Sequence, residues 1–106
     1  MATAAEVRKL ALSLEGTTTH PHFERTAFKV RRIYATLAGD GLSLNVKLTP
    51  DEQAFKTMLA PDIYTAIPNG WGRQGWTTID LARIGTEELE AVLRMAWTHG
   101  QAQRTR

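Results

Sequence analysis

The stretch that decides the fold runs from residue 27 to residue 53 and reads AFKVRRIYATLAGDGLSLNVKLTPDEQ. Apolar and polar residues alternate over residues 28–30, 33–37 and 42–46. That alternation is typical of half-buried strands, and Gly39-Asp40-Gly41 supplies the positive φ angles that a hairpin turn needs. The stretch therefore predicts three strands of an antiparallel meander.

Three helices are predicted around this meander from their cap signals. Thr3 begins a capping box that precedes a leucine-rich segment. Thr49 begins a second box, with Pro50 at the first helical position and Glu52 completing the pair of cap hydrogen bonds. Thr86, followed by two glutamates, opens a third helix, because acidic side chains are favourable at a helix N-terminus.

The remaining segments complete the order of elements. Residues 17–26 are polar and contain a proline, so we expect an irregular lead-in to the first strand. Residues 63–67 and 76–81 are two further extended segments. The order α-β-β-β-α-β-β-α predicts an α+β two-layer sandwich, an antiparallel sheet with its helices packed on one face. We expect the core to contain Leu10, Leu14, Phe28, Leu44, Val46, Phe55, Leu59, Trp76, Ile79, Leu89, Val92 and Leu93.

The composition is that of an ordinary globular domain. With 106 residues, 42% of them hydrophobic and 23% charged, we expect one domain over residues 1–100 and a flexible polar tail over 101–106. The absence of cysteine excludes thiol catalysis, disulfides and thiolate metal sites. We expect a cytoplasmic protein with no membrane contact, since neither a signal peptide nor an apolar run of ~20 residues is present. The net charge is only +2, so any binding to nucleic acid depends on where the charges lie.

The order and spacing of several short motifs resemble the MmcQ/YjbR family of small bacterial proteins, from Val7 to about Trp97. The motifs that carry the resemblance are Leu14-Glu15-Gly16, Ala27-Phe28-Lys29-Val30, Tyr34-Ala35, Leu44-Asn45-Val46-Lys47, Pro50-Asp51-Glu52, Gly75-Trp76, Ile79-Asp80-Leu81, Glu88-Leu89, Leu93 and Ala96-Trp97. The resemblance implies a fold similar to that of type III secretion chaperones and a proposed "double wing" mode of DNA binding.

The chain departs from the family pattern at two places. Glu15 stands where the family often has a proline, and Arg31-Arg32 replace a common Gly-Lys between the first two strands of the meander. The first departure is a surface detail. The second adds charge to the turn and changes what its tip can contact.

Lys29, Arg31 and Arg32 form one candidate DNA-binding site. Guanidinium groups make bidentate hydrogen bonds to phosphate oxygens, and binding gains free energy when counterions are released from the phosphates. The alternative is a solvated turn whose charges keep an exposed sheet edge from pairing with another chain.

The stretch Asn69-Gly70-Trp71-Gly72-Arg73-Gln74-Gly75 forms the second candidate site. Its glycines predict a flexible loop that offers the aromatic face of Trp71 and the cation of Arg73, with Asn69 and Gln74 as hydrogen-bonding partners for a nucleic acid. The loop could equally close over a small ligand. In the alternative structural reading, Trp71 folds back on the sheet and the glycines only permit the bend.

The other constellations point away from catalysis and metals. His20-Pro21-His22-Phe23-Glu24 is interpreted as a surface loop, because no further ligands accompany it. The glycine spacing from Gly70 to Gly75 precedes a strand instead of opening a helix, so it is not a dinucleotide site. The chain has two serines, Ser13 and Ser43, and neither lies beside a base, so we expect no catalytic residue. From the histidine segment and the glycine spacing we also expect no metal and no cofactor.

The sequence thus predicts a small non-enzymatic module that binds DNA weakly, with little sequence preference, through Lys29, Arg31, Arg32 and the Asn69–Gln74 loop. Two alternatives remain: a protein-interaction or chaperone-like domain, and a small-ligand sensor that closes the Trp71 loop. The sequence indicates no oligomeric state.

Overall fold

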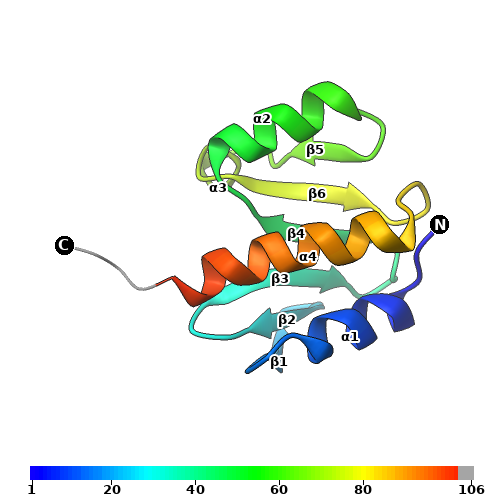
Figure 1. Cartoon of the computed structure of the whole chain (residues 1–106), viewed down its shortest axis with the longest axis vertical. Coiled ribbons are helices and arrows are strands. Elements are labelled where there is room, and N and C mark those ends of the chain that lie inside the picture. The colour runs from blue at the N-terminus through cyan, green and yellow to red at the C-terminus, as the bar shows by residue number, and fades with distance from the viewer. Residues whose placement is uncertain (103–106) are drawn as a thin grey trace.

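The computed structural model describes residues 1–102, which form a six-stranded sheet and four helices (Figure 1). In chain order the elements are α1 (Ala4–Ser13), β1 (Thr18–His22), β2 (Arg25–Lys29), β3 (Ile33–Ala38), β4 (Ser43–Lys47), α2 (Pro50–Leu59), β5 (Tyr64–Ala66), α3 (Gly70–Arg73), β6 (Trp76–Asp80) and α4 (Thr86–Gln101).

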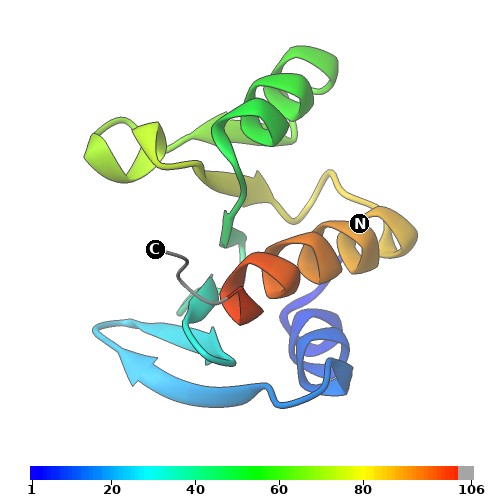
Figure 2. The same ribbon diagram turned by 60° about the vertical axis from the view of Figure 1, so that its left-hand side comes forward.

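The strands form one antiparallel sheet in the order β1-β2-β3-β4-β6-β5. Helices α1, α2 and α4 cover one face of this sheet, and α4 lies across β3 and β4 (Figures 1 and 2). Alternate strand residues such as Leu44, Val46 and Ile79 are fully buried against these helices. The α+β fold predicted from the sequence is therefore confirmed.

Most of the predicted core is buried. Phe28, Leu89 and Leu93 have no exposed surface, and Leu10 packs against the core while half-buried. Trp76 is half-buried on the opposite face of the sheet. The structure adds the fully buried side chains of Tyr34 and Leu48, which no sequence pattern indicated.

The prediction was wrong for α2. Phe55 is 56% exposed and Leu59 is 65% exposed, and no residue of α2 is buried. The helix lies over the short edge strand β5. Lys56 covers the ring of Tyr64, and Gln53 donates hydrogen bonds to β6. The apolar stripe of α2 therefore points away from the sheet.

Two elements were not predicted. Residues 18–22 form β1, which pairs with β2 from Thr18↔Lys29 to His22↔Arg25. All five of its side chains are exposed, so the strand lacks the burial period that marks the others. The Trp71 loop, expected to be flexible, forms the one-turn helix α3.

The predicted caps of the first two helices are confirmed. The amide of Glu6 donates to Thr3 Oγ1 at 3.2 Å, and the amide of Glu52 donates to Thr49 Oγ1 at 3.1 Å. Helix α4 begins at Thr86 and continues through Gln101, so the predicted tail is helical at its first residue. The rest of that prediction, residues 103–106, lies outside the described residues. Within residues 1–102, no helix is long and apolar enough to span a membrane.

Candidate functional site

The sheet face opposite the helices is hollowed into an open cavity of about 850 Å³. Its floor is made by β2, β3, β4 and β6, and its rims by α3, the β2–β3 turn and the end of α4. The lining residues are His22, Arg25, Lys29, Arg31, Arg32, Ile33, Thr36, Asn45, Lys47, Ile67, Trp71, Gln74, Trp76, His99, Gly100 and Ala102.

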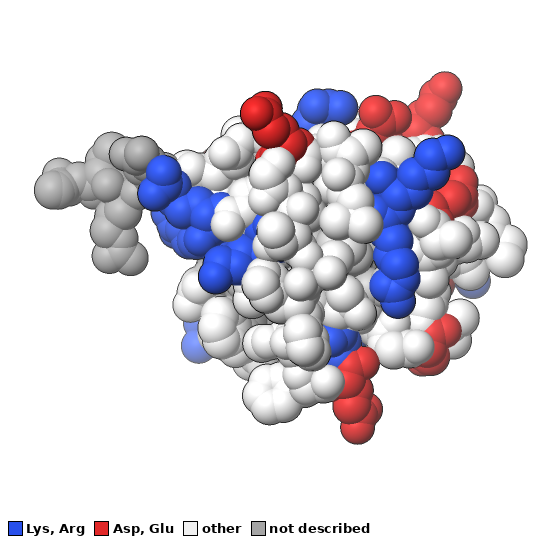
Figure 3. Space-filling model, turned by 90° about the horizontal axis from the view of Figure 1, so that it is seen from below, with Lys and Arg blue, Asp and Glu red and all other residues white. Residues whose placement is uncertain are grey.

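The charged side chains that line this cavity are lysines and arginines. Five lysines and arginines and two histidines line it, and no aspartate or glutamate does. Among residues 1–102, none of these five cations has a carboxylate oxygen within 4.0 Å. Figure 3 shows several Lys and Arg side chains grouped at one end of the face that it draws, with others spread over the rest of that face. The cavity therefore favours an anionic ligand.

Arg25 lies along the cavity floor from β2 to β3. Its Nε donates to Thr36 Oγ1 at 2.9 Å, and its Nη2 donates to the Thr36 carbonyl at 2.8 Å. Burial lowers the pKa of Arg25 from its ordinary value, although Asp40 acts in the opposite direction. A cation that has lost part of its hydration in this way gains from an anionic partner.

Lys47 joins the floor to the α3 rim. Its ammonium group donates to the carbonyls of Leu48 at 3.0 Å and Gln74 at 2.7 Å. Burial lowers the pKa of Lys47, the positive charge of Arg32 lowers it further, and Glu52 raises it. Lys47 and Arg32 therefore repel each other across the cavity, and an anion between them would relieve that repulsion.

Trp71 is presented by a helical turn that is fixed to the sheet. Asn69 caps α3 by accepting from the Trp71 amide at 2.8 Å, and Gln53 donates to the Gly72 carbonyl at 3.0 Å. A Cβ on Gly72 would lie 1.7 Å from the Ile67 carbonyl oxygen, so only glycine permits this close approach. Trp71 stays 60% exposed and lines the cavity.

The end of α4 closes one end of the cavity. The guanidinium group of Arg32 donates to the Ala102 carbonyl at 2.8 Å, and the backbone amide of Arg32 donates to the Gly100 carbonyl at 3.1 Å. His99 Nε2 lies 2.8 Å from Glu52 Oε1, which also serves the cap of α2. The β2–β3 turn, α4 and α2 are thereby tied together at this rim.

Five of the seven predicted site residues line this one cavity: Lys29, Arg31, Arg32, Trp71 and Gln74. Asn69 acts as the cap of α3, and Arg73 does not line the cavity. The sequence prediction missed Arg25, Asn45 and Lys47 on the cavity floor. The signal that could have found them is the alternation of the strands, in which the polar residues mark the sheet face opposite the core. Those polar residues are Arg25 and Lys29 in β2, and Asn45 and Lys47 in β4.

The histidine-rich segment adds little to the site. His20 Nε2 is hydrogen-bonded to Thr18 Oγ1, and only His22 reaches the cavity. In the part of the chain that the structure describes, no three His, Asp or Glu side chains are placed to share a metal ion.

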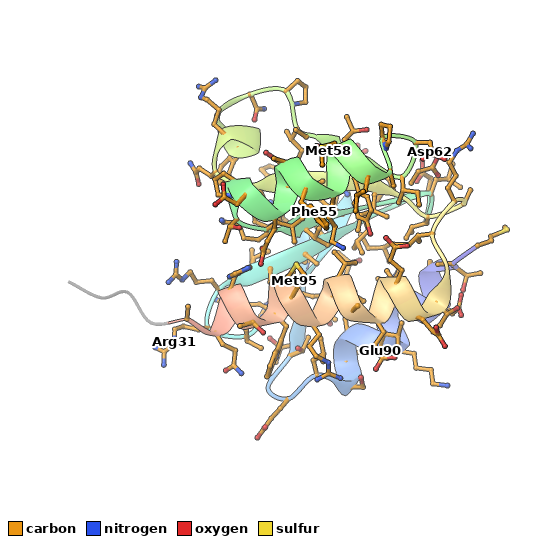
Figure 4. All side chains as sticks on the ribbon, turned by 45° about the horizontal axis from the view of Figure 1, so that its top comes forward. Arg31, Phe55, Met58, Asp62, Glu90 and Met95 are labelled. Carbon is orange, nitrogen blue, oxygen red and sulfur yellow. The ribbon has the colours of Figure 1, made fainter. Side chains whose placement is uncertain are left out.

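A second exposed feature lies on the helix side of the molecule. Phe55, Met58 and Leu59 of α2 are each more than half exposed, and we call them the α2 apolar patch. Phe55 lies on the side of α2 toward α4, where Met95 is half-buried (Figure 4). None of these four side chains lines the basic cavity.

Comparison with known proteins gives the family and the fold. The family model described as YjbR matches residues 12–99. Protein DR2400 of Deinococcus radiodurans, which contains a DUF419 domain, superposes with a TM-score of 0.78 at 23% identity, over 92% of this chain and 77% of that one. A protein from Pseudomonas syringae superposes with a TM-score of 0.63 at 13% identity, over 88% of this chain and 94% of that one. No curated protein sequence matches the chain. Because the family model covers most of its length, this chain belongs to the YjbR family.

Proposed function

We propose that this protein is a non-enzymatic cytoplasmic module that binds DNA by holding phosphates in the basic cavity. The observation that supports the proposal is the lining itself: five lysines and arginines, no carboxylate, and an open shape that a polymer can cross. Phosphodiester oxygens are the anions that such a cluster binds well, because each contact releases a condensed counterion.

The cations differ in the role that they play in this proposal. Lys29 and Arg31 are exposed at the rim, so they can adjust to successive phosphates. Arg25 and Lys47 are held by carbonyl and hydroxyl oxygens on the floor, and their positions are set before the ligand arrives. Contacts to phosphate fix position without reading the bases. We therefore expect weak, sequence-tolerant binding, with a dissociation constant on the order of 10⁻⁴ to 10⁻⁶ M at physiological salt.

The test is a salt titration with two double variants of equal charge. Lys29→Ala with Arg31→Ala removes two cations from the rim of the cavity. Arg8→Ala with Lys9→Ala removes two exposed cations from α1, outside the cavity. Binding to a fluorescent DNA oligonucleotide is followed by anisotropy over a range of salt concentrations.

The rim variant should lower the slope of log K against log salt by about one unit for each lost phosphate contact, and the α1 variant should leave the slope near that of the parent. Equal effects of the two variants would show that only the overall charge matters. The proposal fails if the parent protein binds no DNA at low salt.

A second candidate function is docking of another protein on the α2 apolar patch. Its support is the exposure of three large apolar side chains on one short helix, which is the kind of surface that partners cover. Apolar docking changes little with salt, whereas phosphate binding falls steeply. Phe55→Ala should weaken the binding of a protein partner and leave the affinity for DNA unchanged.

A further inference from the structure

We infer that the cavity takes an unpaired DNA strand, with a base lying on the face of Trp71. This inference rests on the proposed function and names the form of DNA that the site selects. Two tryptophans, Trp71 and Trp76, line the same cavity as the cations. A surface that only held the outside of a duplex would have no use for two indole rings beside its cations.

Trp71 has the properties of a stacking platform. The residue is 60% exposed, although its side chain is one of the largest apolar side chains in the protein. Its backbone is fixed by three hydrogen bonds in the turn, from the Trp71 amide to Asn69, from Gln53 to Gly72 and from Lys47 to Gln74. A ring on a fixed backbone loses little conformational entropy when a base stacks on it.

The floor between the rings and the cations can accept base edges. Asn45 lies on the floor, and its Oδ1 accepts from Thr78 Oγ1 at 2.7 Å. Within residues 1–102, no group accepts from the Asn45 amide nitrogen. That nitrogen and the side chain of Gln74 remain available for carbonyl or ring-nitrogen acceptors of a base.

The exposed cations and the exposed tryptophan lie on different rims of the cavity. Lys29, Arg31 and Arg32 come from β2 and the β2–β3 turn, whereas Trp71 comes from α3 beyond β6. A strand in the cavity can therefore keep its phosphates on the cationic rim while a base reaches the aromatic rim. In a duplex the base faces are covered by their own stack, so only an unpaired base can use Trp71.

The test compares a single-stranded DNA oligonucleotide with a DNA hairpin that has the same number of phosphates and is closed by a non-nucleotide linker, so that all its bases are paired. Trp71→Ala removes the platform, and Phe55→Ala is the matched control, an aromatic residue of similar exposure outside the cavity. Trp71→Phe keeps an aromatic face. Melting curves for each variant establish that the fold is retained.

The parent should bind the single strand more tightly than the hairpin. Trp71→Ala should weaken single-strand binding about 5- to 140-fold and change hairpin binding less than about twofold. Trp71→Phe should keep most of the single-strand affinity, and Phe55→Ala should keep all of it.

The inference is overturned if Trp71→Ala leaves single-strand binding unchanged, weakens both probes equally, or if the parent prefers the hairpin. In each of those cases the salt titration with the rim variant decides separately whether the cavity binds DNA. If neither probe binds at low salt, the proposed function fails together with the inference.

Discussion

The ammonium group of Lys47 donates a 2.7 Å hydrogen bond to the carbonyl oxygen of Gln74 and so ties the end of β4 to the turn that presents Trp71. The same side chain also donates to the Leu48 carbonyl at 3.0 Å. One lysine therefore contributes charge to the cavity floor and holds the aromatic rim in place.

Lys47→Met should loosen the α3 turn. The Gln74 amide bonds to the carbonyls of Gly70 and Trp71, and its hydrogen exchange should become faster in the variant. Exchange of the Ile79 amide, in the central sheet, should change much less. Equal protection of Gln74 in parent and variant would show that the lysine does not hold the turn.

Leu93→Ala and Leu59→Ala separate the core from the α2 apolar patch. Leu93 is fully buried in α4, so its truncation should lower the free energy of unfolding by about 2–5 kcal/mol. Leu59 is 65% exposed, and its truncation should stay within about 0.5 kcal/mol. Urea melts of the two variants measure both values, and a similar loss for Leu59→Ala would mean that α2 packs its apolar stripe inward after all.

Thr49→Ala should remove the cap of α2. The Thr49 hydroxyl accepts from the Glu52 amide, and loss of such a cap costs about 1 kcal/mol of stability. Thr98→Ala is the control, because Thr98 is an exposed residue near the end of α4 whose hydroxyl donates to the Arg94 carbonyl of the same helix. Denaturant melts should show the loss for Thr49→Ala alone; comparable losses for both variants would argue against the cap.

Tyr64 should make stability fall with pH in alkaline solution. Burial raises the pKa of the Tyr64 hydroxyl, and its hydrogen bond to Glu88 raises the pKa further. In the unfolded chain the hydroxyl ionises near pH 10, while in the folded protein it keeps its proton to higher pH. The unfolded state therefore binds fewer protons above about pH 10, and stability decreases as pH rises from there.

Tyr64→Phe tests this dependence through melts taken between about pH 9 and 11. The variant should lose less stability over that range than the parent. Tyr34, whose pKa burial also raises, still titrates in both proteins and so cancels in the comparison. Parallel curves for the two proteins would remove Tyr64 as the cause.

The sequence was a good guide wherever one residue pattern had one structural solution. The capping boxes at Thr3 and Thr49 and the alternation over residues 28–46 have such solutions, because each satisfies backbone or burial requirements locally. The sequence prediction missed strand β1, because β1 is held by its pairing with β2 while its side chains stay in solvent. An exposed edge strand leaves no burial period in the sequence.

The apolar stripe of Phe55 and Leu59 misled the prediction because amphipathicity shows that a helix has an apolar face and does not show what covers it. For the cavity, the sequence identified the exposed turn and the tryptophan loop. It could not reveal that Arg25 and Lys47, on strands separated by β3, converge on the same floor, since that depends on the sheet order and on which face the helices cover.

The most direct test of the account is a nuclear magnetic resonance titration of the ¹⁵N-labelled protein with a single-stranded DNA oligonucleotide at low salt. The account predicts that the largest shift changes fall on Arg25, Asn45, Lys47 and the indole N–H of Trp71, with no change at Phe55. Changes confined to the α2 apolar patch, or spread over exposed lysines and arginines with the cavity floor unaffected, would contradict it.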